Sequence, residues 1–147
     1  MLNHVLIEER LALMAGYLRE LEIIAKRPQG EFLQDRILSG AAESYLRRSL
    51  EVVFDIGRHI LSKSGATELA GEFKGIARGL AERGVVGAEL GQRLVQMTGY
   101  RNRLVHLYNQ VTDQELYGII TNDLADLRAF IREIRDYVAR CAADHRD

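Results

Sequence analysis

Hydrophobic residues recur every three or four positions along most of the chain, a spacing typical of α-helices with one buried face. The first such segment runs from about Leu2 to Lys26, and Pro28 and Gly30 interrupt the pattern after it. The predicted buried face of this segment consists of Leu6, Leu13, Tyr17, Leu21 and Ile24.

The same spacing predicts four further helices. The second begins as a short turn and continues as a long helix, which Ser64 and Gly65 end. The last begins sharply, because Thr112-Asp113-Gln114-Glu115 is a capping-box sequence. The predicted ranges are about 31–61, 67–82, 88–104 and 112–142.

The connections between these helices are short, which implies antiparallel neighbours. We therefore expect an all-α, up-and-down bundle of about five helices. No linker is long or low in complexity, so a single domain is expected over residues 1–147. Gly71, Gly75 and Gly79 share one face of the third helix, and we interpret this stripe as close helix packing, since charged residues lie between them.

Composition and charge narrow the class of protein. The net charge of −1 argues against a protein that coats nucleic acid through bulk charge, although a small phosphate-binding patch needs only a local field. The single cysteine, Cys141, fits a reducing compartment. Glu8, Glu9 and Arg10 interrupt the N-terminal apolar stretch, and no apolar run reaches the roughly 20 residues of a membrane span. We expect a cytoplasmic protein without membrane contact.

The side chains best suited to chemistry lie near the end of the fourth helix. Arg101 can hold phosphate through a planar set of donors, and His106 can transfer protons near neutral pH. On an ideal helix Arg101 points nearly the same way as Tyr108, and Asn102 lies about one turn before His106. Arg101 and His106 diverge by about 140°. An irregular helix end, or a second subunit, would bring this pair together.

Spacing alone leaves two interpretations of these residues open. In the functional one, His106 moves a proton at a ribose hydroxyl or leaving oxygen, and Arg101 stabilises the charge that develops on the phosphate. Asn102 would then orient the imidazole. In the structural one, His106 caps carbonyls at the helix end and Arg101 makes surface contacts.

A second row of polar residues follows the long helix at four-residue intervals and consists of Arg47, Glu51, Asp55 and His59. It can be a solvated face held by local charge pairs worth a few tenths of a kcal/mol each. Alternatively, part of it faces the site and positions Arg101 or His106, with Glu51 and Asp55 the stronger candidates. No His, Asp and Glu cluster has metal-ligand spacing, so we expect neither a metal nor another cofactor.

The segment Arg101-Asn102-x-x-Val105-His106-x-Tyr108, followed by a loop and an acidic helix start at Asp113, resembles the HepT-like branch of the HEPN superfamily. The resemblance covers most of the chain. It implies a small helical bundle, typically a homodimer whose two motifs face a shared cleft. It also implies a metal-independent endoribonuclease toxin that cleaves RNA by 2′-hydroxyl attack, with Arg101 and His106 as catalytic residues.

The resemblance also implies a regulatory partner. Toxins of this branch are often inhibited by a minimal nucleotidyltransferase antitoxin that transfers AMP to the motif tyrosine, here Tyr108. A bulky anion on Tyr108 would fill the phosphate site and occupy Arg101. Two alternatives remain open: a non-catalytic HEPN module that binds nucleotide or protein through the same cleft, and a helical interaction protein whose motif is incidental.

Overall fold

The computed structural model describes residues 2–65, 72–105 and 111–144. Within these ranges the regular structure is entirely α-helical, which confirms the predicted fold class. The described residues form seven helices: α1 (His4–Ala25), α2 (Gln29–Gln34), α3 (Arg36–Lys63), α4 (Phe73–Glu82), α5 (Ala88–Val105), α6 (Asp113–Asn122) and α7 (Leu124–Asp144).

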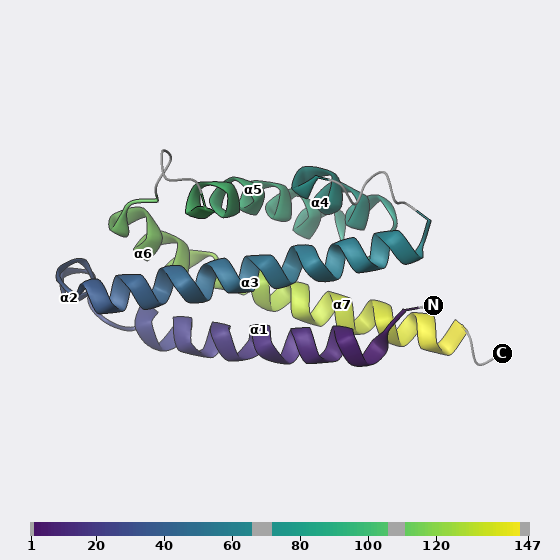
Figure 1. Cartoon of the computed structure of the whole chain (residues 1–147), viewed down its shortest axis with the longest axis horizontal. Coiled ribbons are helices and arrows are strands. Elements are labelled where there is room, and N and C mark those ends of the chain that lie inside the picture. Colours follow the sequence, from purple (N-terminus) through teal and green to yellow (C-terminus); the bar gives the residue numbers. More distant parts are fainter. Residues whose placement is uncertain (1, 66–71, 106–110, 145–147) are drawn as a thin grey trace.

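The long helices α1 and α3 lie side by side in opposite directions along the length of the molecule (Figure 1). Helix α7 packs along α1, while α4 and α5 pack together against α3. The short helices α2 and α6 meet at the end of the molecule where α1 passes into α3. Helix α3 therefore occupies the centre of the bundle, and both α1 and α5 rest on it.

The core contact of α1 differs from the prediction. Of the five residues expected on its buried face, Leu21 and Ile24 are buried, whereas Leu6 and Tyr17 are only partly covered and Leu13 is 50% exposed. The other buried residues of α1 are Ile7, Leu11, Met14 and Leu18. The predicted face was only partly right because α1 carries hydrophobic residues on more than one side. Their periodicity therefore did not select a unique buried face.

The short turn predicted before the long helix is a separate helix, α2, and the predicted last helix is divided into α6 and α7. Asp35 has an extended backbone, and its carboxylate accepts hydrogen bonds from the amides of Ile37 (3.0 Å) and Leu38 (3.3 Å), which begins α3 separately from α2. The predicted last helix is interrupted at Asp123. Just before it, the Thr121 hydroxyl and the Asn122 amide donate to main-chain carbonyls of the preceding turn, at 2.7 and 2.8 Å. Such local bonds compete with a continuous helix.

The predicted helix ends are otherwise largely observed. The Thr112 hydroxyl accepts a hydrogen bond from the Glu115 amide at 3.1 Å, as the capping-box sequence requires. Gly84 has φ of +71° directly after the end of α4, a conformation that favours glycine. Helix α4 begins at Phe73 in the described residues, and the predicted start at Thr67 lies outside them. None of the helices that the structure describes combines the length and hydrophobicity needed to cross a bilayer.

Helices α4 and α5 approach closely at Gly91, where an added Cβ would lie 2.5 Å from the Cβ of Ala81. Gly91→Ala should therefore lower the free energy of unfolding by about 1–3 kcal/mol through overpacking. Gly99, on the same helix, has open space around its Cβ position, so Gly99→Ala should be neutral or stabilising by up to about 1 kcal/mol. Urea unfolding of both variants measures the contrast, and equal stabilities would contradict the close approach.

Candidate functional site

Arg101 lies near the end of α5 and contacts two other helices. Its Nε donates to Oε1 of Glu51 on α3 at 2.8 Å, and its side chain is only 20% exposed. Its guanidinium carbon lies 3.9 Å from the centre of the Phe73 ring on α4. Its Nη1 makes a long contact, 3.5 Å, with Oδ1 of the adjacent Asn102. The cation is thus held on one edge by a carboxylate and on one face by an aromatic ring.

This arrangement leaves part of the guanidinium available. Among the residues that the structure describes, Nη2 of Arg101 has no hydrogen-bond partner, and Nη1 has only the long contact with Asn102. Arginine keeps its charge at any physiological pH. The free edge is therefore a fixed positive donor group suited to an anionic oxygen such as that of a phosphate.

Phe73 is a site residue that the sequence analysis did not single out. Its ring packs edge-on against Phe54 of α3, with centroids 4.8 Å apart, so its orientation is set by the core. The guanidinium carbon of Arg58 lies 5.9 Å from the same ring, which places a second cation near Arg101. A lone phenylalanine at a helix start carries no motif, and only the packing of α4 on α3 and α5 reveals its contact.

The structure separates the two acidic residues that were predicted to support the site. Glu51 contacts Arg101 directly, across 50 positions of sequence. Asp55, one turn further along α3, pairs with Arg58 at 3.3 Å and with Arg10 of α1 at 3.9 Å instead. Asp55 therefore adjoins the site through Arg58 and does not touch Arg101.

The expected ladder of charge pairs along α3 is not what holds these residues. Glu51 and Asp55 form their ion pairs with residues outside the row. His59 accepts a hydrogen bond at Nε2 from the backbone amide of Asn3, at 3.2 Å. Burial, with a smaller contribution from Lys63, lowers the pKa of His59, which favours the neutral form that can accept this bond.

A second arginine fixes the end of α5. Arg103 binds the Glu115 carboxylate at the start of α6 through two hydrogen bonds, of 2.6 and 2.7 Å. Burial, together with the carboxylates of Asp123 and Glu115, raises the pKa of the neighbouring Tyr100. The predicted catalytic His106 and the predicted modification site Tyr108 lie outside the described residues. Arg103 and Glu115 flank the segment that carries both.

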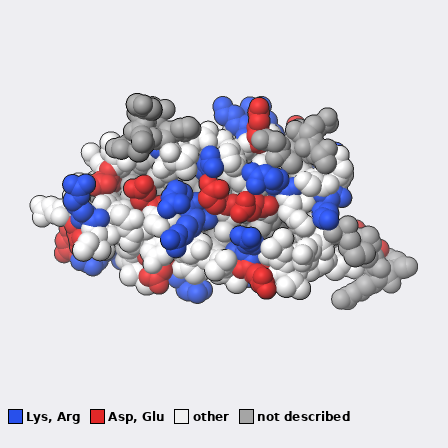
Figure 2. All heavy atoms as spheres, viewed as in Figure 1, with Lys and Arg blue, Asp and Glu red and all other residues white. Residues whose placement is uncertain are grey.

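On the face shown in Figure 2, Lys and Arg side chains alternate with Asp and Glu side chains across the middle of the molecule. Within the described ranges, no three His, Cys, Asp or Glu side chains are grouped so that they could hold a metal ion.

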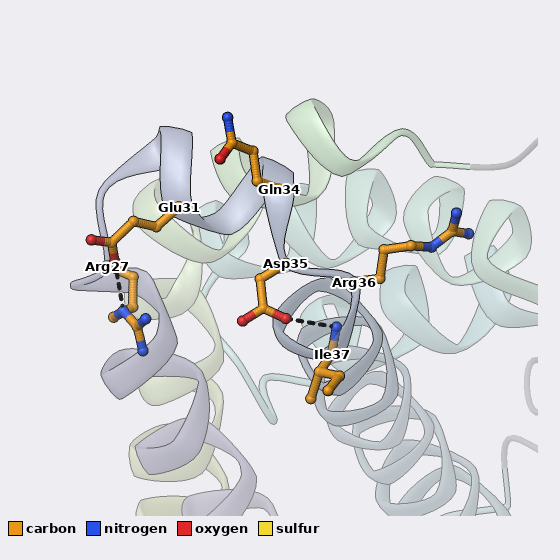
Figure 3. A pocket seen from close by; sticks show the side chains of 6 residues that line it. All are labelled: Arg27, Glu31, Gln34, Asp35, Arg36 and Ile37. Carbon is orange, nitrogen blue, oxygen red and sulfur yellow. Dashed lines mark hydrogen bonds and ion pairs between the residues drawn. The ribbon is translucent and has the colours of Figure 1, made fainter.

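A separate hollow lies where α1, α2 and α3 meet, lined by Arg27, Glu31, Gln34, Asp35, Arg36 and Ile37 (Figure 3). Its charged side chains are largely used in local structure. Arg27 pairs with Glu31 at 2.9 Å, and Asp35 caps α3. We therefore assign the candidate site to Arg101 and its neighbours.

Comparison with known proteins agrees with the all-α fold described above. Residues 14–134 match the HepT-like family, described as ribonuclease HepT-like. The curated tRNA nuclease HepT of Aphanizomenon flos-aquae is 27% identical over 134 residues, which is 91% of this chain and 90% of that protein.

Solved structures with the same fold include toxin–antitoxin complexes. One is a tri-AMPylated Shewanella oneidensis HEPN toxin in complex with MNT antitoxin, with a TM-score of 0.78, 23% identity, and coverage of 88% of this chain and 96% of that one. Another is a toxin–antitoxin complex with AMP-PNP, with a TM-score of 0.77, 22% identity, and coverage of 88% and 97%. The chain thus has the all-α fold of these toxins, and it belongs to the HepT-like ribonuclease family.

The ion pair between Glu51 and Arg101 makes a specific prediction for Arg101. In Glu51→Ala, the Nε–H proton of Arg101 should exchange faster with water, because its acceptor is gone. Asp55→Ala is a matched control one turn away, since Asp55 pairs with other arginines. Nitrogen-detected NMR of the arginine side chains measures the exchange. Equal exchange rates in both variants would contradict the observed pairing.

Proposed function

We propose that this protein is an endoribonuclease toxin of a toxin–antitoxin system and that Arg101 binds the phosphate at the cleavage site. The main support for this proposal is the geometry of Arg101. Glu51 and Phe73 hold its guanidinium, while Nη2 has no hydrogen-bond partner among the described residues. Membership of the HepT-like ribonuclease family supports RNA as the substrate. The relative named tRNA nuclease makes tRNA the first RNA to test.

The proposed reaction needs a charge stabiliser and a proton carrier. A ribose 2′-hydroxyl attacks the adjacent phosphorus, and the bond from phosphorus to the 5′-oxygen breaks, which leaves a 2′,3′-cyclic phosphate and a 5′-hydroxyl. His106 takes the proton of the attacking hydroxyl while water protonates the leaving 5′-oxygen, or it protonates that oxygen while water takes the hydroxyl proton. Arg101 stabilises the negative charge on the non-bridging oxygens. Because these two side chains supply both requirements, we propose that cleavage is metal-independent.

The remaining site residues are proposed to position this pair. Glu51 fixes the guanidinium of Arg101, and Asn102 contacts its Nη1. We propose that Asn102 also orients His106, which follows it by four residues in the sequence. Asp55 contributes through Arg58. The divergence of Arg101 and His106 on an ideal helix supports a homodimer in which a second subunit completes the site.

Tyr108 is proposed as the point of control. A cognate minimal nucleotidyltransferase antitoxin would transfer AMP to its hydroxyl, and the added phosphate would occupy the free edge of Arg101. The AMPylated HEPN toxin with the same fold, bound to its MNT antitoxin, supports this proposal. We propose that both partners act in the cytoplasm.

Arg101→Ala and His106→Ala should each lower the rate of RNA cleavage by about 10²–10³-fold while the protein stays folded. The assay follows cleavage of a tRNA pool in the presence of EDTA, with circular dichroism to confirm the fold. Arg78→Ala and His4→Ala are matched controls, since both side chains are exposed and neither adjoins Arg101.

Wild-type rates in either site variant would refute the catalytic assignment. Loss of wild-type cleavage on addition of EDTA would refute metal independence. Nucleotide binding without any cleavage by the wild-type protein would favour the alternative, a non-catalytic HEPN module.

Tyr108→Phe should cleave RNA at close to the wild-type rate but resist inhibition by the antitoxin with ATP, because it lacks the hydroxyl that accepts AMP. Intact-mass spectrometry should show added AMP on the wild-type protein and none on the variant. Tyr100→Phe is the matched control and should be modified and inhibited like the wild type. AMP addition to Tyr108→Phe at the wild-type level would place the modification elsewhere.

A further inference from the structure

The outer face of α1 is unusually apolar for a helix that the bundle leaves uncovered on that side. Val5 is 68% exposed and Ile23 is 60% exposed, and half-exposed Leu13 lies between them. The inner face of the same helix is fully used by the core. The outer residues therefore form a second hydrophobic surface, and burial of exposed apolar area is a common reason for such a surface.

The spacing of this outer face is that of a helix seam. Six residues follow one another at alternating intervals of four and three, the pattern of positions that meet between paired helices. These residues, here called the α1 seam, are Val5, Glu9, Ala12, Gly16, Arg19 and Ile23. Large apolar residues lie at its ends and the two smallest at its centre. A shallow hollow covers that centre, lined in part by Glu9, Ala12 and Gly16.

The α1 seam is complementary to itself when it is turned end for end. In an antiparallel pair centred between Ala12 and Gly16, each Val5 faces Ile23 of the second copy, and each Glu9 faces Arg19 of the second copy. Ala12 faces Gly16, where small side chains let the helices approach closely. Each contact occurs twice, as a two-fold axis requires.

The charges on the α1 seam are available for this pairing. Glu9 and Arg19 form no ion pair within the described part of the chain. The Nη2 atom of Arg19 lies 3.7 Å from the Cβ position of Gly16, so the guanidinium extends along the seam toward its centre. Moving the pairing by one residue would place Glu9 opposite Glu20 twice, which like-charge repulsion disfavours. The charges thus select one register.

We propose that the α1 seam binds the same seam of a second copy of this chain, antiparallel and about a two-fold axis. A membrane surface is the less suitable occupant, because Glu9 and Glu20 would lie against anionic lipid and interfacial helices are typically rich in basic residues. A helix of 22 residues provides a contact about 33 Å long, which is sufficient for six facing layers.

This interface is distinct from the candidate site. On one side of the α1 seam, Arg10 reaches Asp55 of α3, and on the other, Glu8 and Glu22 pair with Arg135 and Arg128 of α7. The seam lies between these flanks and contains none of the residues around Arg101. A homodimer that brings two Arg101 motifs together would use another surface, so both interfaces can exist in one assembly. The proposal does not depend on ribonuclease activity.

A charge exchange tests the proposal by sedimentation equilibrium at tens of micromolar protein. Glu9→Arg places two cations opposite each other twice, and Arg19→Glu does the same with two anions. Each single variant should therefore have half the mass of the wild-type assembly. Both masses should be whole multiples of 16.6 kDa, the mass of one chain. The double variant Glu9→Arg/Arg19→Glu restores opposite charges and should return to the wild-type mass. Glu43→Arg makes the same change of charge at an exposed position of α3 and should have the wild-type mass.

A packing variant and a crosslink test the same seam independently. Gly16→Leu should keep its helix content, because leucine favours helix, yet lose association by separating the two helices. Oxidation of a mixture of Val5→Cys and Ile23→Cys proteins, both with Cys141→Ser, should give a disulfide-linked pair. Either protein alone should not crosslink, since identical positions lie about 27 Å apart along the paired helices.

Several results would overturn the proposal: a monomeric wild-type protein in this concentration range, wild-type mass in both single charge variants, or a double variant that stays at half mass. Crosslinking of either cysteine protein alone as strongly as the mixture would overturn the antiparallel register. Cleavage of RNA is not used as a readout, so failure of this proposal leaves the proposed ribonuclease function standing.

Discussion

The contact between Arg101 and Glu51 is the constraint around which the site end of this bundle is organised. A guanidinium cannot lose its charge, so its partial burial requires a nearby carboxylate and good hydrogen-bond geometry. Glu51 provides this from α3, the helix at the centre of the bundle, and Phe73 covers one face from α4. Three helices must therefore be assembled before Arg101 takes the position that exposes its free edge.

The sequence predicted the fold class well because hydrophobic periodicity reports burial, and burial drives helix packing. It predicted helix ends where the signal is local, as at Thr112. It predicted a short turn before the long helix, but not the break at Asp123, where side chains bond to main-chain groups in competition with the helix. It identified only part of the buried face of α1, because a helix that is apolar on two sides gives no single answer.

The site shows the same division between local and long-range information. Arg101 and Asn102 were identified from their spacing to His106, which is a local pattern. Glu51 was one of two acidic candidates on the long helix, and only the packing of α5 on α3 distinguished it from Asp55. Phe73 had no local signal, since its role is a contact between helices. On α1, half-exposed Leu13 was predicted to be buried, but it lies on the outer side of the helix with exposed Val5 and Ile23.

Because the last predicted helix is interrupted at Asp123, α6 is a separate helix that links the site to the turn between α1 and α2. Arg103 joins the end of α5 to Glu115 of α6, and Tyr117 of α6 donates from its hydroxyl to the carbonyl of Arg27 at 2.6 Å and packs on Phe32. This chain of contacts runs from the motif to the α1–α2 turn. For a toxin of the proposed kind, a genetic selection for surviving cells would thus recover lesions at Tyr117 and Phe32 as well as in the motif. Under the proposed function, part of the mutational target for losing toxicity therefore lies in α2 and α6, outside the motif itself.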